Sequence, residues 1–145
     1  MLNEQVRRIM SSEPVVVSPS DNVNEVSEMM VRMQLQQLPV VENGKFVGIV
    51  TSYDLWQNCR SGNATADQTI SEVMTTRVIK ISPKDKMATA AELFMDKRFK
   101  TLPVVNLNNE LKGVITAFDV IKYVLKTEYP HPSIYNTILN EAATR

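Results

Sequence analysis

A threonine followed three residues later by an aspartate occurs twice in this chain, each time directly after a short apolar run. Thr51 and Asp54 follow Gly48-Ile49-Val50, and Thr116 and Asp119 follow Gly113-Val114-Ile115. An ionised carboxylate accepts several hydrogen bonds, including those of both hydroxyls of a ribose. A hydroxyl beside the free N–H groups of a helix N-terminus suits a phosphate, aided by the helix dipole. These residue types at this spacing favour a site for a sugar and a phosphate.

The same spacing has a purely structural interpretation. In a capping box, Thr at the N-cap accepts from the third helical N–H, and the acid at that third position bonds back to the N-cap. Capping alone would explain each motif singly, although Glu or Gln serves that role better than Asp. Capping and ligand binding can share the same residues, so both interpretations stay open.

The elements that must position these residues follow from hydrophobic periodicity. Each apolar run predicts the end of a strand, and Asp54 to about Cys59 predicts a helix. Asn43-Gly44 predicts a two-residue hairpin turn between a strand at 38–41 and one at 45–50. Upstream we expect a short amphipathic helix over 2–10, a strand at 14–17, and a helix whose core-facing stripe contains Val23, Val26, Met29, Met30 and Met33.

The chain then repeats this pattern. Leu38-Pro39-Val40-Val41 corresponds to Leu102-Pro103-Val104-Val105, and Ser18-Pro19 corresponds to Ser82-Pro83. Beyond the hairpin the offset grows by one residue, because the second turn is longer. An insertion confined to a hairpin tip is one that a real duplication tolerates.

The repeat predicts the domain organisation. We expect one repeat over 7–60, a polar linker over 61–70, a second repeat over 71–126 and a helical tail over 127–145. A unit this small buries a modest core, so the two copies are expected to pack on each other. Tyr53 and Trp56 are expected to pack at their interface.

Composition excludes several classes of function. Lys plus Arg and Asp plus Glu number 16 each, so no strong field favours nucleic acid or an anionic membrane. No apolar run is long enough to span a bilayer and no leader opens the chain, which predicts a cytoplasmic protein. One cysteine and one histidine supply little for a disulfide, a zinc site or a nucleophile pair. We therefore expect no enzyme.

In its ordered set of motifs, the chain resembles the cystathionine β-synthase (CBS) domain family in its tandem form, often called a Bateman module. The motifs are Ile9-Met10, Val15 to Pro19, Leu38 to Val41 and Gly48 to Asp54, with their equivalents in the second copy. The resemblance implies an α/β (α+β) fold of two β-α-β-β-α repeats related by a pseudo-twofold axis. It also implies that adenosine-containing ligands bind in the cleft between the repeats.

By this resemblance each site is crossed, with residues of one repeat facing residues of the other. One site would join Ile49, Thr51 and Asp54 to Val78, Ile79, Lys100 and Thr101. The other would join Val114, Thr116 and Asp119 to Pro14, Val15, Gln36 and Gln37. Only the first has a cation just before the Leu-Pro pair, so we expect unequal sites with anionic nucleotide on the Asp54/Lys100 side.

The resemblance implies a stand-alone regulatory module rather than a catalyst. The expected ligands are AMP, ADP or ATP, with S-adenosylmethionine as a further candidate, and no cofactor or metal is required. The expected partners are a second copy of the chain and an effector protein, without nucleic acid or membrane. Two alternatives stay open: a dimerisation scaffold with an empty cleft, and an enzyme acting on a nucleotide.

Overall fold

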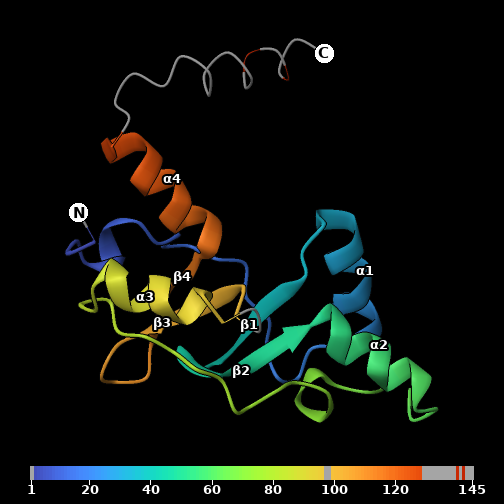
Figure 1. The fold of residues 1–145 in the computed structure, drawn as a ribbon. Helices are drawn as coiled ribbons and strands as arrows, with labels where there is room; N and C mark the ends of the chain where they lie inside the picture. The colour runs from blue at the N-terminus through green and yellow to red at the C-terminus, as the bar shows by residue number, and fades with distance from the viewer. Residues whose placement is uncertain (1, 97–98, 129–139, 141, 143–145) are drawn as a thin grey trace.

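The computed structural model describes residues 2–96, 99–128, 140 and 142. Two similar units lie side by side, one containing α1 and α2 and the other containing α3 and α4 (Figure 1). The elements in chain order are η1 (Val6–Arg8), α1 (Val23–Met33), β1 (Gln37–Glu42), β2 (Lys45–Thr51), α2 (Ser52–Arg60), η2 (Ile70–Glu72), α3 (Met87–Phe94), β3 (Thr101–Val105), β4 (Leu111–Thr116) and α4 (Ala117–Glu128). Most of the predicted tail helix lies outside the described residues.

Each repeat is built on an antiparallel hairpin. Strand β1 pairs with β2, with Leu38 opposite Val50, and β3 pairs with β4, with Leu102 opposite Ile115. Asn43 and Gly44 have φ values of 52° and 79°, the left-handed backbone that a two-residue hairpin turn requires. The predicted hairpin at this turn is confirmed.

The predicted first strand of each repeat is reduced to a single bridge. Val17 pairs in parallel with Val40, donating its N–H to the carbonyl of Pro39. The next parallel bond would run from the N–H of residue 39 to the carbonyl of Val15, and proline has no N–H to donate. Ile81 repeats this arrangement, donating to the carbonyl of Pro103. The prediction of a full strand at 14–17 was therefore wrong.

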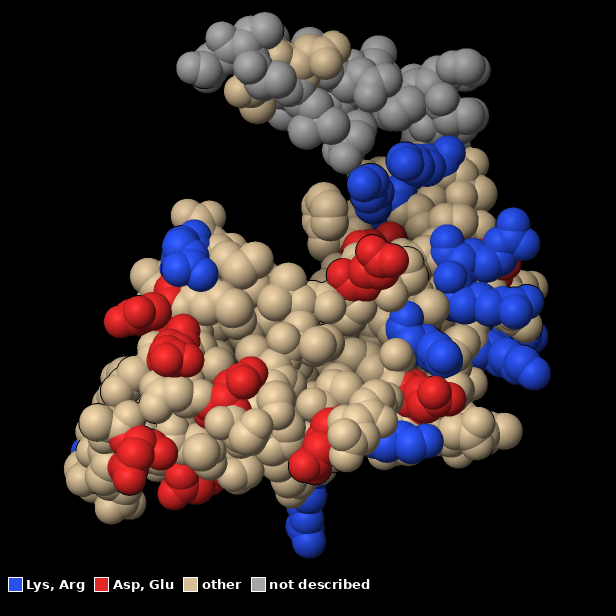
Figure 2. Space-filling model, turned by 180° about the vertical axis from the view of Figure 1, so that it is seen from behind, with Lys and Arg blue, Asp and Glu red and all other residues tan. Residues whose placement is uncertain are grey.

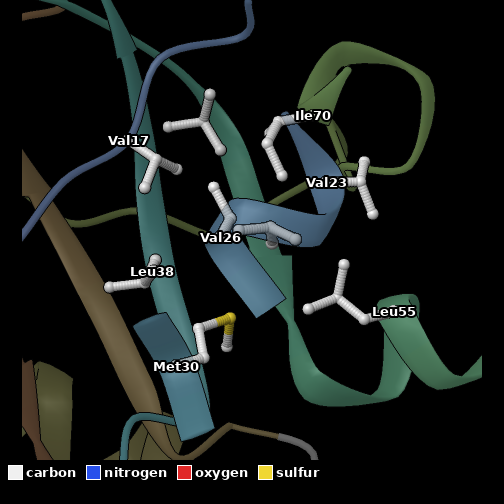
Figure 3. Packing of buried hydrophobic residues seen from close by; sticks show 9 residues of the cluster. Val17, Val23, Val26, Met30, Leu38, Leu55 and Ile70 are labelled. Atoms are coloured by element: carbon white, nitrogen blue, oxygen red, sulfur yellow. The ribbon is translucent and has the colours of Figure 1, made fainter. Parts of the chain in front are cut away.

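The first core confirms most of the predicted helical stripe. Val23, Val26 and Met30 of α1 are buried against Leu38 of β1 (Figure 3). Helix α1 begins at Asn22, whose side chain accepts a hydrogen bond from the Glu25 N–H. Met33, expected in the same stripe, is 46% exposed at the last position of the helix.

Each hydrophobic core contains a residue that the sequence places outside the corresponding repeat. Ile70, which the sequence places at the end of the linker, is fully buried in the first core. Val6, which lies before the predicted first repeat, is fully buried in the second core. Backbone bonds hold both crossings, with Ile70 N–H donating to the Asp21 carbonyl and Val6 N–H to the Asp85 carbonyl.

The segments around Ser11 and Thr75, which we call the crossing segments, each run from one repeat to the other. Two glycines permit them to approach the strands. Ile49 of β2 exchanges backbone hydrogen bonds with Thr75, and Val114 of β4 exchanges them with Ser11. A Cβ on Gly48 would lie 2.7 Å from the Thr75 carbonyl oxygen, and one on Gly113 would lie closer still to the carbonyl oxygen of Ser11. Only glycine fits at both crossings.

A small apolar cluster joins the two repeats. Phe46, Ile49 and Val105 are buried there, with Val78 and Leu111 packed against them. Tyr53 and Trp56, expected at this interface, are instead 63% and 54% exposed on α2. Leu55, between them in the sequence, is the residue of α2 that is buried in the first core.

Candidate functional site

The Thr-x-x-Asp motifs form capping boxes at the starts of α2 and α4. Asp54 N–H donates to Thr51 Oγ1 at 3.0 Å, and Thr51 N–H donates to Asp54 Oδ2 at 3.0 Å. The corresponding distances in the second motif are 3.1 Å and 2.8 Å, between Asp119 and Thr116. The capping interpretation is thus correct for both motifs, and it fixes the orientation of both carboxylates.

A residue from the second repeat binds the first carboxylate. Thr75 Oγ1 lies 3.2 Å from Asp54 Oδ1 and 3.3 Å from Oδ2, so it donates to this carboxylate. A carboxylate has about four acceptor positions, so Asp54 retains capacity for further donors. Sequence reasoning missed Thr75, although it stands at the place of Ser11 in the duplication, directly after a methionine.

A cavity of about 410 Å³ lies beside this motif, between the repeats. Six of the seven residues predicted for this site line it: Ile49, Thr51, Val78, Ile79, Lys100 and Thr101. Asp54 is not in the lining, but both of its neighbours, Thr51 and Thr75, are. The structure therefore brings together the residues of the two repeats that the crossed arrangement requires.

The first cavity has an apolar wall and a basic rim. Ile49, Val78, Ile79 and Phe99 supply apolar surface, whereas Arg77 and Lys100 are exposed cations. Sequence reasoning missed Arg77 and Phe99; a basic residue directly before Val78-Ile79 was the available signal for the first. Two nearby cations favour an anionic ligand in this cavity.

The start of α2 offers less to a phosphate than expected. Its Ser52 N–H donates to the Gln36 carbonyl and its Asp54 N–H donates to Thr51. Two of the first three N–H groups are thus already used. Arg77 and Lys100, rather than the helix N-terminus, are the groups most available to an anion in this cavity.

A second, smaller cavity of about 260 Å³ adjoins the first, because Gln37, Ile49 and Thr101 line both. Pro14, Val15, Gln37 and Val114, all predicted for this site, line it. Three further residues predicted for this site, Gln36, Thr116 and Asp119, are not in its lining. Gln36 is exposed.

The second cavity differs from the first in charge. Glu13 lines it, and none of its described lining residues is Lys or Arg. A carboxylate at this position disfavours a polyphosphate through like-charge repulsion. The inequality of the two sites stays a prediction, and the different charges of the two cavity linings favour it.

The described residues contain no group of three or more His, Cys, Asp and Glu that could hold a metal ion. Within the same part of the chain, no helix has the length and apolar character needed to cross a bilayer. The free thiol of Cys59 is exposed on α2, and Cys59 is not among the residues that line the two cavities.

Two interlocked hairpin repeats with a crossed cleft between them define a class of protein. The family model of the CBS domain matches residues 6–55 and 70–126, one copy on each repeat. The chain belongs to the CBS domain family.

Solved structures of CBS pairs share this fold. CBSX2 of Arabidopsis thaliana, in complex with AMP, is 26% identical with a TM-score of 0.74, covering 86% of this chain and 98% of that one. The CBS domain pair of protein MJ0100, in complex with 5′-methylthioadenosine and S-adenosyl-L-methionine, is 25% identical with a TM-score of 0.70, covering 83% and 94%. The α/β fold predicted from the repeats is confirmed.

Curated relatives include both small and large proteins. Protein MJ1225 of Methanocaldococcus jannaschii is 32% identical over 132 residues, which cover 83% of this chain and 47% of that protein. CBS domain-containing protein YhcV of Bacillus subtilis is 25% identical, with coverage of 90% and 93%. A homoserine O-acetyltransferase of Methanocorpusculum labreanum is matched over only 22% of its length. The chain thus spans about half or less of several relatives.

Proposed function

We propose that this chain is a regulatory module that binds an adenine nucleotide in the first cavity and transmits the binding to a partner. The observation that carries the proposal is the crossed lining, in which Thr51 of one repeat and Val78, Ile79 and Lys100 of the other enclose one space. Similar CBS pairs that hold AMP or S-adenosylmethionine support the ligand class.

Each part of a nucleotide has a matching group in this cavity. Asp54 is placed to accept the ribose hydroxyls, while Ile49, Val78 and Ile79 give the adenine an apolar slot. Arg77 and Lys100 would neutralise the phosphates, which favours AMP, ADP or ATP there over uncharged adenosine. The second cavity, with Glu13 in its lining, suits an adenosyl group without phosphates, S-adenosylmethionine among them.

Regulation follows from the position of the cavity between two separately packed cores. A ligand that contacts both repeats shifts any equilibrium between their relative arrangements by its differential affinity for those arrangements. We infer that the output is a changed surface, presented to an effector protein or to a second copy, and that such a module reports cellular energy state. The free, exposed thiol of Cys59 fits a reducing, cytoplasmic compartment.

The competing function is a scaffold with an empty cleft. The capping boxes favour it, because they account for Thr51 and Asp54 without any ligand. Isothermal titration calorimetry with AMP, ATP, adenosine and S-adenosylmethionine separates the two. We expect saturable binding with ATP or AMP tighter than adenosine; no heat with any of the four would favour the scaffold.

The inequality of the two sites is tested by removing the charge of Glu13 at the second cavity. Glu13→Gln should raise the affinity of the second cavity for phosphate-bearing ligands and leave the affinity of the first cavity unchanged. A stoichiometry of two equal ATP sites in the unmodified chain would contradict this assignment.

A further inference from the structure

Both oxygens of the Asp54 carboxylate face one hydroxyl of the other repeat. Thr75 Oγ1 lies 3.2 Å from Asp54 Oδ1 and 3.3 Å from Asp54 Oδ2, so a single hydrogen is shared almost equally between the two oxygens. In a strong hydrogen bond from a hydroxyl to a carboxylate, the two oxygens lie about 2.6 Å apart. The contact between Thr75 and Asp54 is therefore long and weak.

Thr75 covers the side of this carboxylate that faces the first cavity. Thr51 and Thr75 line the cavity, whereas Asp54, which accepts hydrogen bonds from both, does not. Asp54 is half-buried and Thr75 is exposed. A ligand that enters the cavity thus meets the Thr75 hydroxyl before it meets the carboxylate.

The vicinal diol of a ribose needs the same side of the carboxylate. Its two hydroxyls have two hydrogens to donate, one for each carboxylate oxygen, where Thr75 has one for both. We propose that the Thr75 hydroxyl holds the place of a ribose hydroxyl in the ligand-free chain, and that a ligand with a vicinal diol displaces it from Asp54. The displacement presupposes the nucleotide binding proposed above, and it makes Thr75 a determinant of affinity for the diol.

The displacement requires only a rotation of the Thr75 side chain. The Thr75 N–H donates to the Ile49 carbonyl at 2.8 Å, and the Thr75 carbonyl accepts from the Ile49 N–H at 2.9 Å, so the backbone stays in place. The side chain is exposed, so the released hydroxyl bonds to water and no donor is left unpaired. Ligand binding would thus remove one hydrogen bond between the repeats without moving the crossing segment.

The charges of the second repeat orient a nucleotide for this displacement. Residues 1–11 and 76–128 contain 12 basic and 7 acidic residues, and Figure 2 shows Lys and Arg gathered over the side of α3 and α4. Arg77 and Lys100 belong to these residues and line the first cavity, so they draw a phosphate toward the second repeat. The ribose is then left for Asp54, on the first repeat.

The second cavity has the equivalent hydroxyl without the contact. Ser11 stands at the place of Thr75 in the duplication and lines the second cavity. In the described part of the chain, no hydrogen bond joins the Ser11 side chain to Asp119, whose carboxylate accepts from the Thr116 N–H. Only the first of the two carboxylates is therefore covered, and Ser11→Ala serves as the matched control.

Calorimetry with two ligands tests the displacement. AMP has the diol, and 2′,3′-dideoxyadenosine 5′-monophosphate has the same base and phosphate without it. Thr75→Val keeps the shape of the side chain and removes the hydroxyl, so AMP should bind about threefold to tenfold more tightly, the effect of one weak hydrogen bond. Affinity for the dideoxy ligand should stay unchanged. Thr75→Ser, which keeps a hydroxyl, and Ser11→Ala should both bind AMP as the unmodified chain does.

Three results would overturn the displacement and leave the nucleotide proposal standing. They are an unchanged AMP affinity in Thr75→Val, a lower one, and an equal gain for both ligands. Failure of AMP to bind to either chain would overturn the proposed function, and this inference with it. NMR of the unmodified chain gives a second measurement that needs no variant. The resonance of the Thr75 methyl group should shift further with AMP than with the dideoxy ligand, and equal shifts would overturn the displacement.

Discussion

At the scale of single residues, the first cavity depends on groups from both repeats whose roles differ. Asp54 accepts from Thr51 and Thr75, and is therefore both a helix cap and a contact between repeats. Arg77 and Lys100 are exposed, and neither makes a hydrogen bond or an ion pair with another described residue. A cap residue affects stability and binding together, whereas the two cations should affect binding alone.

Replacing the cations should weaken anionic ligands selectively. We expect Arg77→Ala and Lys100→Ala each to lower ATP affinity by about fivefold to tenfold, about 1 kcal/mol, since charge-assisted contacts at exposed groups are of that size. Adenosine affinity should change little. Lys126→Ala, an exposed cation on α4, is the control. Calorimetry decides, and equal ATP affinity in all three variants would refute the phosphate role.

Asp54→Asn separates the two roles of the carboxylate. The amide keeps the size of the side chain and one acceptor oxygen, so we expect the free energy of unfolding to fall by only about 1 kcal/mol. The loss of a charged acceptor for the ribose hydroxyls should have a larger effect, and we expect AMP affinity to fall about tenfold or more. Asp119→Asn weakens a helix cap without a contact between repeats, so it should lower the free energy of unfolding by no more than Asp54→Asn and should leave AMP affinity unchanged. Identical AMP binding in both variants would place the nucleotide elsewhere.

At the scale of elements, the features that depend on local sequence pattern were predictable. The features that depend on contacts between distant segments of the chain were not. The hairpin at Asn43-Gly44 and the buried face of α1 follow from turn chemistry and helical period. The strand at 14–17 failed because Pro39, on a neighbouring strand, lacks the N–H that would extend the pairing. Nothing local marks Ile70 as a residue of the first core. Similarly, Arg77 joins the site only through the crossing segment that contains Thr75.

The crossings predict a strict requirement for glycine. Gly48→Ala would press a methyl group against the Thr75 carbonyl. Two backbone hydrogen bonds with Ile49, one donated and one accepted, hold Thr75 in place. We expect a loss of about 3 kcal/mol in the free energy of unfolding. Gly62→Ala, where a Cβ meets open space but φ is 77°, should cost only about 1 kcal/mol. Urea denaturation of both variants checks the difference, and equal losses would argue against a tight crossing.

The turn between β3 and β4 predicts a pH dependence. The Asn106 side chain donates to Glu110 at 3.0 Å, and this bond, with Lys112 nearby, lowers the pKa of the Glu110 carboxyl. A lowered folded-state pKa contributes stability above the ordinary pKa and loses it as the pH falls through the folded value. Glu110→Gln should therefore be slightly less stable than the unmodified chain near neutrality, and the difference should vanish in acid. A difference that grows on acidification would contradict the shift.

At the scale of the whole molecule, function rests on two cores joined by a small cluster and a shared groove. The CBS family and the α/β repeats were predictable because the ordered motifs occur twice. The ligand class came from resemblance and residue chemistry, whereas the charge difference between cavities became specific only when Arg77 and Glu13 appeared in their linings. In the proposed function, a ligand that contacts both repeats would change their relative arrangement and so report its own presence.

A crystal structure of the chain grown with AMP tests the central claim most directly. We predict the adenosine in the first cavity, its ribose hydroxyls on Asp54, its base between Ile49 and Val78, and its phosphate toward Arg77 and Lys100. A cavity closed by protein side chains, or AMP bound away from Asp54, would contradict the claim and leave a packing module.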